Sequence, residues 1–174
     1  MSNTIQATLY CDVDGVINIA AKSAQDTVSK VIFRKLPSVG KHLSPVPLKI
    51  NWRESMVESL ALLPVSFFWL TTWNHQAVNI LEPLTGLRSH GVLPYNMKLR
   101  EFRRQTNKYG ILRAHQELNP TPFIWIDDVA TRHYNERHWD GAAEHLVIRP
   151  ISRFGITDDH LEEIKEFLLK FNSK

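Results

Sequence analysis

Short apolar runs alternate along this chain with segments whose apolar residues repeat at helical spacing. Four runs have the length of a buried strand, and they cover residues 7–13, 65–70, 122–126 and 145–148. Between them, apolar side chains recur every three or four residues, as in amphipathic helices. Strands that alternate with helices predict an α/β fold, in which a three-layer, Rossmann-like parallel sheet has helices on both faces.

Four helices are expected between and after these strands. The first is predicted to open at Asn51, because Asn51-Trp-Arg-Glu54 resembles a capping box and leads into a helical apolar pattern. The second and third are predicted at about 74–84 and 106–118. The fourth is predicted to begin after Thr157, a residue type common at the N-cap, and it has two acidic residues in its first turn.

The segment at about 18–50 departs from this alternation. Several prolines and Gly40 interrupt it between β-like runs at 31–33 and 47–50. The segment is too short to form a domain of its own. We therefore expect one domain over residues 1–174, with a small β-rich flap inserted after the first strand.

Polar residues stand at the ends of three predicted strands. They are Asp12 and Asp14 at the end of the first strand, Thr71 after the second, and Asp127 and Asp128 after the third. Parallel sheets of this kind place their ligand sites outside the carboxyl ends of the strands, so we expect these side chains to lie together.

Two of these features have simpler interpretations when each is taken alone. The string from Asp12 to Gly15 also fits a turn with Asx-type hydrogen bonds, in which Gly15 supplies the sharp bend. A threonine after a strand is ordinary, and Thr72 is the alternative to Thr71. The order of the whole set therefore determines the interpretation.

Lys108 is unusual on physical grounds. It is predicted to lie in the first turn of the third helix, where a cation is unfavourable against the helix dipole. Local rules are often broken at functional sites. Lys98 is the alternative lysine for such a site.

The order of these motifs resembles the haloacid dehalogenase-like hydrolase superfamily. Its four motifs are an Asp-x-Asp strand end, a Ser or Thr strand end, a lysine and an acidic strand end, and all four occur here in order over roughly residues 9–129. The resemblance implies that Asp12 is the nucleophile that forms an aspartyl-phosphate. It implies that Asp14 is the acid/base, which protonates the leaving oxygen and later activates water.

The resemblance also implies the remaining parts of the site. Thr71 and Lys108 would bind the phosphoryl group, with Asp128 and Gly15 in supporting positions. The implied cofactor is Mg²⁺, which prefers hard oxygen ligands. Its implied ligands are the Asp12 carboxylate, the main-chain oxygen of Asp14 and the Asp127 side chain.

The expected activity is that of a Mg²⁺-dependent phosphomonoester hydrolase, a phosphatase of the superfamily with little or no cap domain. Haloacid dehalogenases themselves lack a carboxylate at the second position of the first motif, so Asp14 argues against carbon–halogen cleavage. Two alternatives stay open. One is a catalytically idle phosphate-binding or interaction module of the same fold, and the other is a phosphatase of a small phosphorylated metabolite.

The charge of the chain bears on the substrate. The net charge is +3 and the pI is about 9.1, with a basic stretch at 98–108 that also fits a solvated helix or loop face. Trp73, beside the Thr71 motif, is a candidate substrate wall that stacks on a base. We therefore expect a phosphorylated substrate, which is a nucleotide, a nucleic-acid end or a metabolite.

Composition indicates the setting. The single cysteine, Cys11, is expected to be a buried core residue, and it excludes an intramolecular disulfide. The apolar runs are shorter than the ~20 residues of a membrane-spanning helix, and the first residues do not resemble a signal peptide. We expect a cytoplasmic protein without a membrane partner.

Overall fold

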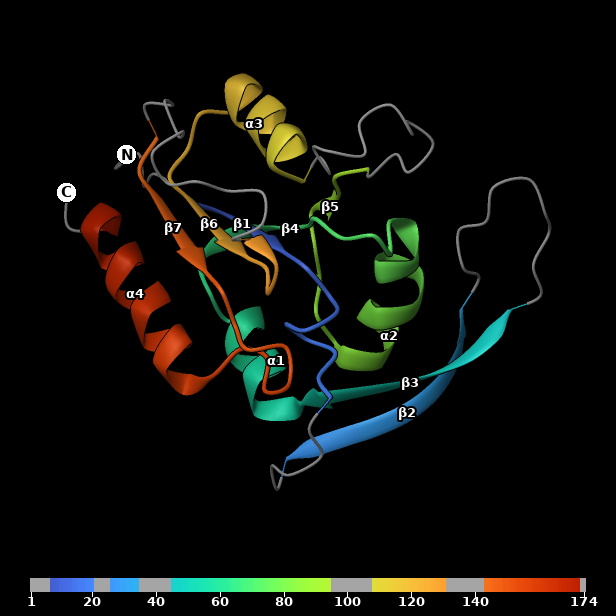
Figure 1. Cartoon of the computed structure of the whole chain (residues 1–174). Coiled ribbons are helices and arrows are strands. Elements are labelled where there is room, and N and C mark those ends of the chain that lie inside the picture. The colour runs from blue at the N-terminus through green and yellow to red at the C-terminus, as the bar shows by residue number, and fades with distance from the viewer. Residues whose placement is uncertain (1–6, 21–25, 35–44, 95–107, 131–142, 173–174) are drawn as a thin grey trace.

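The computed structural model describes residues 7–20, 26–34, 45–94, 108–130 and 143–172. Within these residues, five parallel strands form one sheet in the order β5-β4-β1-β6-β7 (Figure 1). The strands are β1 (Ala7–Cys11), β4 (Val65–Trp69), β5 (Gly91–Val92), β6 (Phe123–Ile126) and β7 (His145–Ile148). The predicted α/β fold with a parallel sheet is confirmed.

Helices cover both faces of this sheet. They are α1 (Glu54–Ala61), α2 (Glu82–Thr85), α3 (Lys108–Leu118) and α4 (Asp158–Asn172), with a short π-helix, η1 (Ala77–Leu81), directly before α2. Figure 1 shows α3 on one side of the sheet and both α1 and α4 on the other. The three layers match the prediction.

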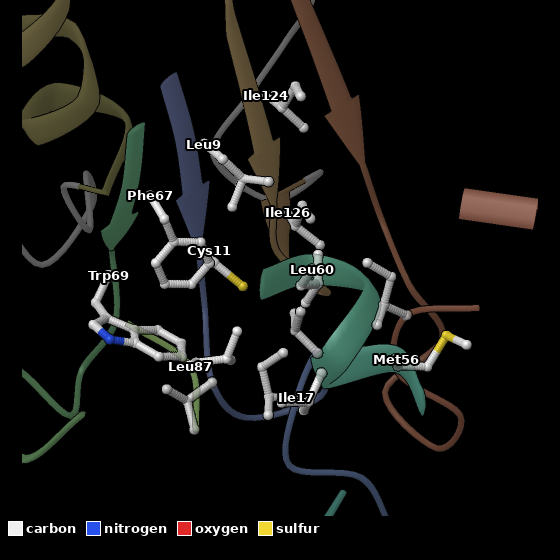
Figure 2. Packing of buried hydrophobic residues seen from close by; sticks show 14 of the residues in the cluster. Leu9, Cys11, Ile17, Met56, Leu60, Phe67, Trp69, Leu87, Ile124 and Ile126 are labelled. Atoms are coloured by element: carbon white, nitrogen blue, oxygen red, sulfur yellow. The ribbon is translucent and has the colours of Figure 1, made fainter. Parts of the chain in front are cut away.

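Alternation along the strands divides the core into two clusters. Leu9 and Cys11 of β1 point to one face, where they pack with Met56 and Leu60 of α1 (Figure 2). Tyr10, between them, points to the opposite face, in the cluster that includes Leu112 of α3. Cys11 is fully buried, as predicted.

The predicted flap contains an antiparallel hairpin. It consists of β2 (Thr27–Arg34) and β3 (Val46–Arg53), and Figure 1 shows it extending away from the sheet beside α2. One face of the hairpin packs on the core through Ile32, Ile50 and Trp52. The hairpin is therefore fixed at one end to the body of the protein.

The prediction that a helix opens at Asn51 is wrong. Residues 51–53 complete β3, and α1 begins at Glu54. The backbone N–H of Asn51 donates to the Asn18 side chain, and the Asn51 amide donates to the carbonyl of Ile19. Long-range strand pairing thus uses the residues that the local pattern assigned to a helix cap.

The other helices agree with the prediction to within a few residues. The predicted helix at 74–84 is observed as η1 and α2, and it ends before Gly86, which has a φ of +80°. Helix α4 follows Thr157, and its buried side chains include Leu161, Ile164 and Leu168. In the residues that the structure describes, none of the helices has the length and apolar character needed to cross a membrane.

The carboxyl ends of the three central strands meet at one edge. The backbone N–H of Asp12 donates to the carbonyl oxygen of Ile126 at 2.9 Å, and that of Leu70 donates to the carbonyl oxygen of Cys11 at 2.9 Å. The N–H of Asp127 donates in turn to Ile148 at 3.1 Å. These bonds fix the residues that follow each strand side by side.

Candidate active site

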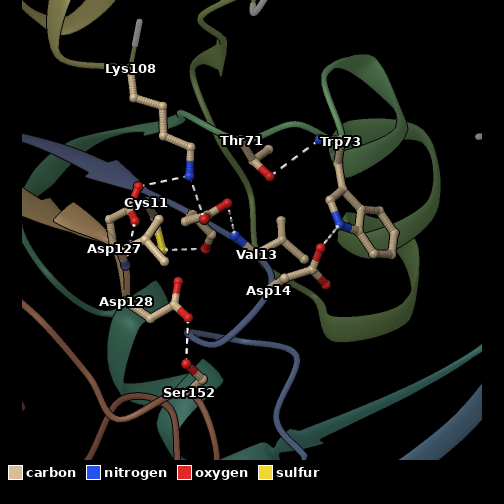
Figure 3. A network of polar contacts seen from close by, with 11 residues as sticks. Cys11, Val13, Asp14, Thr71, Trp73, Lys108, Asp127, Asp128 and Ser152 are labelled. Atoms are coloured by element: carbon tan, nitrogen blue, oxygen red, sulfur yellow. Dashed lines mark hydrogen bonds and ion pairs between the residues drawn. The ribbon is translucent and has the colours of Figure 1, made fainter. Parts of the chain in front are cut away.

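Lys108 joins two aspartates that come from neighbouring strands. Its Nζ donates to Oδ2 of Asp127 at 2.7 Å and also to Oδ2 of Asp12 (Figure 3). All three side chains are buried. Lys108 is the first residue of α3 and therefore lies in its first turn, as predicted, where its two carboxylate partners outweigh the unfavourable helix dipole.

Backbone N–H groups hold the other oxygens of the same two carboxylates. Val13 N donates to Oδ1 of Asp12 at 2.7 Å, and Val129 N donates to Oδ1 of Asp127 at 2.9 Å. Each carboxylate is therefore oriented by its own turn and by the shared lysine. Such pre-oriented groups lose little freedom when a ligand binds.

Burial dominates the electrostatics of this group. It raises the pKa of Asp12 to about 6, against the lowering effect of the Lys108 charge and with a further increase from the charge of Asp127. Burial by itself would lower the pKa of Lys108, but the two carboxylates outweigh it and raise that pKa above its ordinary value. At neutral pH the site therefore contains an ionised Asp12 beside a protonated lysine.

Helix α3 is fixed to the sheet by polar contacts on the face that carries Tyr10. The Tyr10 hydroxyl lies 2.7 Å from Nδ1 of His115, and Nε2 of Gln116 donates to it at 2.8 Å. Both partners belong to α3 and Tyr10 belongs to β1, the strand before Asp12. This contact positions Lys108 relative to the aspartate that it contacts.

Asp14 lies apart from this buried group, on the side of the cavity. One of its oxygens accepts a hydrogen bond from Nε1 of Trp73 at 2.8 Å, and the other accepts one from Nδ2 of Asn18 at 2.9 Å. Asp14 is exposed, whereas Asp12 is buried. The two predicted catalytic carboxylates thus have different surroundings, which their different roles require.

The prediction that Trp73 is a substrate wall is wrong. A wall that stacks on a base needs an exposed ring face, and Trp73 is 0% exposed. Its ring packs in the core, while its indole N–H points to Asp14 (Figure 3). Trp73 therefore positions Asp14 instead of contacting the substrate.

The two threonines of the second motif have different positions. Thr71 is 0% exposed, and its Oγ1 accepts a hydrogen bond from the backbone N–H of Trp73 at 3.3 Å. This contact fixes the hydroxyl at the end of β4. Thr72, the alternative, lines the cavity.

Gly15 and Asp128 pack against each other at the mouth of the site. Gly15 has a φ of +76°, and a Cβ added to it would lie 2.3 Å from Oδ2 of Asp128. The same oxygen accepts a hydrogen bond from Oγ of Ser152 at 2.5 Å. Glycine is therefore required both for the turn and for the space that Asp128 occupies.

A cavity of about 640 Å³ opens beside these residues. Its walls include the catalytic candidates Asp12, Asp14 and Lys108, together with Gly15, Thr72 and Asp128. Lining residues that the sequence analysis did not assign to the site are Asn18, Ile19, Ala20, Lys49, Asn51, Val129 and Ser152. Lys49 and Asn51 belong to the hairpin, so the flap forms one wall of the cavity.

Three carboxylates can hold a metal ion here. Oxygens of Asp12, Asp127 and Asp128 all lie within 4.8 Å of one another. Carboxylate oxygens are the ligands that Mg²⁺ prefers, so the donor set fits the expected cofactor. The Asp14 carboxylate is not a member of this group, and the expected contribution of its main-chain oxygen stays a prediction.

Some predicted features lie outside the described residues. These are Gly40 of the predicted flap segment, the alternative lysine Lys98, and the other basic residues of the stretch that precedes Lys108. The structure places every remaining predicted site residue around the carboxyl ends of β1, β4 and β6.

The chain matches no protein-family model, no curated protein and no solved structure. The functional conclusion therefore depends on the geometry of the site.

Proposed function

We propose that this protein is a Mg²⁺-dependent phosphomonoester hydrolase that acts through an aspartyl-phosphate on Asp12. The observation that supports it most is the buried group of Lys108, Asp12 and Asp127, with Asp14 two residues away from the nucleophile. Simple packing does not explain this group, because buried charges of this kind are costly to the fold. Functional sites are where such perturbed groups concentrate.

In the first step an oxygen of Asp12 attacks phosphorus. A new bond forms between that oxygen and phosphorus, and the bond from phosphorus to the ester oxygen breaks. Asp14, in its protonated form, donates its proton to the leaving oxygen. The Lys108 ammonium lies beside Asp12 and stabilises the negative charge that the phosphoryl oxygens bring into the site.

In the second step a water molecule attacks the same phosphorus. Asp14, now ionised, accepts the proton of this water, and the bond between phosphorus and Asp12 breaks to release inorganic phosphate. Trp73 and Asn18 hold the Asp14 carboxylate in one orientation, at the rim of the cavity from which both leaving group and water have access. Each proton that Asp14 donates is thus replaced within one turnover.

Bound Mg²⁺ supplies charge neutralisation that lets the anionic phosphoryl group approach the carboxylates. Asp12, Asp127 and Asp128 would hold it, and the Ser152 hydroxyl fixes Asp128 for this purpose.

The experiment measures phosphate release in Mg²⁺ from p-nitrophenyl phosphate, nucleotides, sugar phosphates and phosphorylated oligonucleotides. We expect release by the native chain and a loss of about 10³-fold or more in Asp12→Asn. Asp159→Asn is the matched control, because it makes the same change at an exposed position of α4. A chelator should abolish release, Mg²⁺ should restore it, and Ca²⁺ should restore it poorly because its longer bonds misplace the phosphate.

The same experiment tests the alternatives. An idle phosphate-binding module would bind inorganic phosphate and release none from any ester. A metabolite phosphatase would release phosphate from a small ester and discriminate against oligonucleotides. Full activity in excess chelator would contradict the proposal.

A further inference from the structure

One face of the β2–β3 hairpin contributes no side chain to the hydrophobic core; it is buried at Asn51, beside the cavity, and exposed farther along the hairpin. Opposite residues of an antiparallel pair share a face, and the register pairs Ser29 with Asn51, Val31 with Lys49, and Phe33 with Pro47. We call these six residues the outer face. The Ser29 hydroxyl donates to the Asn51 side chain at 2.6 Å, which confirms that these two side chains lie on the same side.

The outer face is continuous with the candidate active site. Asn51 and Lys49 line the cavity that also contains Asp12 and Asp14. Successive residues on one face of a strand are about 7 Å apart, so the face extends outward from the cavity in a row. The face thus offers a contact surface to a substrate that is longer than a small ester and has its phosphate at Asp12.

Beyond the cavity wall, the outer face exposes large apolar side chains. Val31 is 63% exposed and Phe33 is 67% exposed. Apolar residues on the other face of the same hairpin, such as Ile50, are buried in the core. An exposed aromatic ring next to a cation at the mouth of an active site fits a ligand that has flat rings and negative charges.

We propose that the outer face binds a single-stranded nucleic acid whose terminal phosphate enters the cavity. This inference rests on the proposed function and names its substrate class. Lys49 contacts a backbone phosphate next to the terminal one, and Phe33 stacks on an unpaired base. Bases within a duplex do not offer a free ring face, which favours a single strand. The net charge of +3 agrees with an anionic partner.

The test measures binding of a short oligodeoxythymidylate with a phosphate at its 5′ or 3′ end, at several salt concentrations. All variants are made in the full chain with Asp12→Asn, so that turnover does not change the ligand. Lys49→Gln should reduce the slope of log affinity against log salt by about 0.7, because one phosphate contact of a single strand is lost. Phe33→Ser should weaken binding about fivefold or more and leave the slope unchanged.

Matched controls lie elsewhere on the chain. Lys30→Gln removes the same charge from an exposed residue on the opposite face of the hairpin, and it should leave both slope and affinity unchanged. Leu118→Ser makes a comparable change at an exposed apolar residue of α3, away from the hairpin, and should also have no effect. Thermal unfolding of each variant verifies that the fold is kept.

Three results would overturn the inference. The first is an unchanged slope in Lys49→Gln, and the second is an equal change in Lys30→Gln. The third is that Lys49→Gln and Phe33→Ser weaken the binding of a small sugar bisphosphate but leave oligonucleotide binding unchanged. Because this readout is binding, it is independent of the phosphate-release experiment, and failure of one is distinguishable from failure of the other.

Discussion

The indole nitrogen of Trp73 lies 2.8 Å from a carboxylate oxygen of Asp14, so a fully buried side chain orients one that is exposed to the cavity (Figure 3). The second oxygen of Asp14 is held by Asn18. The acid/base candidate is thus held at both carboxylate oxygens, by a buried core residue and by a residue that lines the cavity.

This contact predicts how the chemistry depends on the leaving group. Trp73→Phe keeps an aromatic ring in the core but removes the N–H donor. We expect kcat to fall about tenfold on an alkyl phosphate, whose leaving oxygen needs a proton. On p-nitrophenyl phosphate, whose leaving group needs none, formation of the intermediate should be far less affected. Equal losses on both esters would indicate a purely structural role for Trp73.

The two threonines of the second motif can be separated by matched variants. Thr71→Val removes a hydroxyl whose oxygen accepts a hydrogen bond from the backbone N–H of Trp73. The proton of this hydroxyl is the expected donor to the phosphoryl group. We expect kcat/KM to fall about tenfold or more, with a smaller loss in Thr72→Val. Steady-state kinetics on p-nitrophenyl phosphate measures both. The reverse order would assign the phosphate contact to Thr72, which lines the cavity.

Removal of the Lys108 charge should destabilise the fold. Lys108→Gln leaves the buried carboxylates of Asp12 and Asp127 without their shared cation, at a cost of about 3 kcal/mol. The double variant Asp12→Asn/Lys108→Gln should lose less than the sum of the two single variants. Urea unfolding gives these free energies. Additive losses would show that the lysine and the aspartate do not interact.

Asp26 predicts a pH dependence at the base of the hairpin. Its carboxylate accepts hydrogen bonds from the Ser55 hydroxyl and from Nε of Arg53 at 3.3 Å, and these lower its pKa against the effect of burial. Because this pKa is lowered by folding, ionised Asp26 stabilises the fold at pH values above the pKa of an unfolded aspartate, about 3.9. The stabilisation is lost as the pH falls through the lower pKa that Asp26 has in the folded protein.

The corresponding variant is Asp26→Asn. It should cost about 1 kcal/mol at neutral pH, and its free energy of unfolding should converge with that of the native chain as the pH falls below about 4. Urea unfolding at several pH values measures the difference. A constant difference down to strongly acidic pH would contradict the prediction.

Residue order was sufficient to predict four of the five strands of the sheet and the polar residues at their carboxyl ends, but not the two-residue edge strand β5. Lys108 is the clearest case, because a cation in the first turn of a helix is locally unfavourable and therefore informative. The structure gives the reason, which is the pair of carboxylates from β1 and β6. Both of those aspartates come at the ends of apolar runs that have the length of a buried strand.

Long-range contacts explain what the sequence did not show. Asn51 has a helix-capping pattern, yet it pairs with Ser29 of the preceding strand, β2, which lies 22 residues earlier in the chain. Trp73 is followed by Asn74, whose φ of +48° turns the chain in a way that local patterns do not predict, and its ring is buried. The position of Lys49 at the cavity depends on the hairpin register, which no local motif specifies.

The central claim is that Asp12 accepts the phosphoryl group. The most direct measurement is a rapid acid quench of Asp14→Asn during turnover of p-nitrophenyl phosphate, followed by peptide mapping. Because this ester forms the intermediate without a proton donor, and the variant lacks the base that activates water, the intermediate should accumulate. We expect phosphate on the peptide that contains Asp12, at the position of that residue. Release of p-nitrophenol with no phosphate on Asp12, or with phosphate on a different residue, would contradict the proposed mechanism.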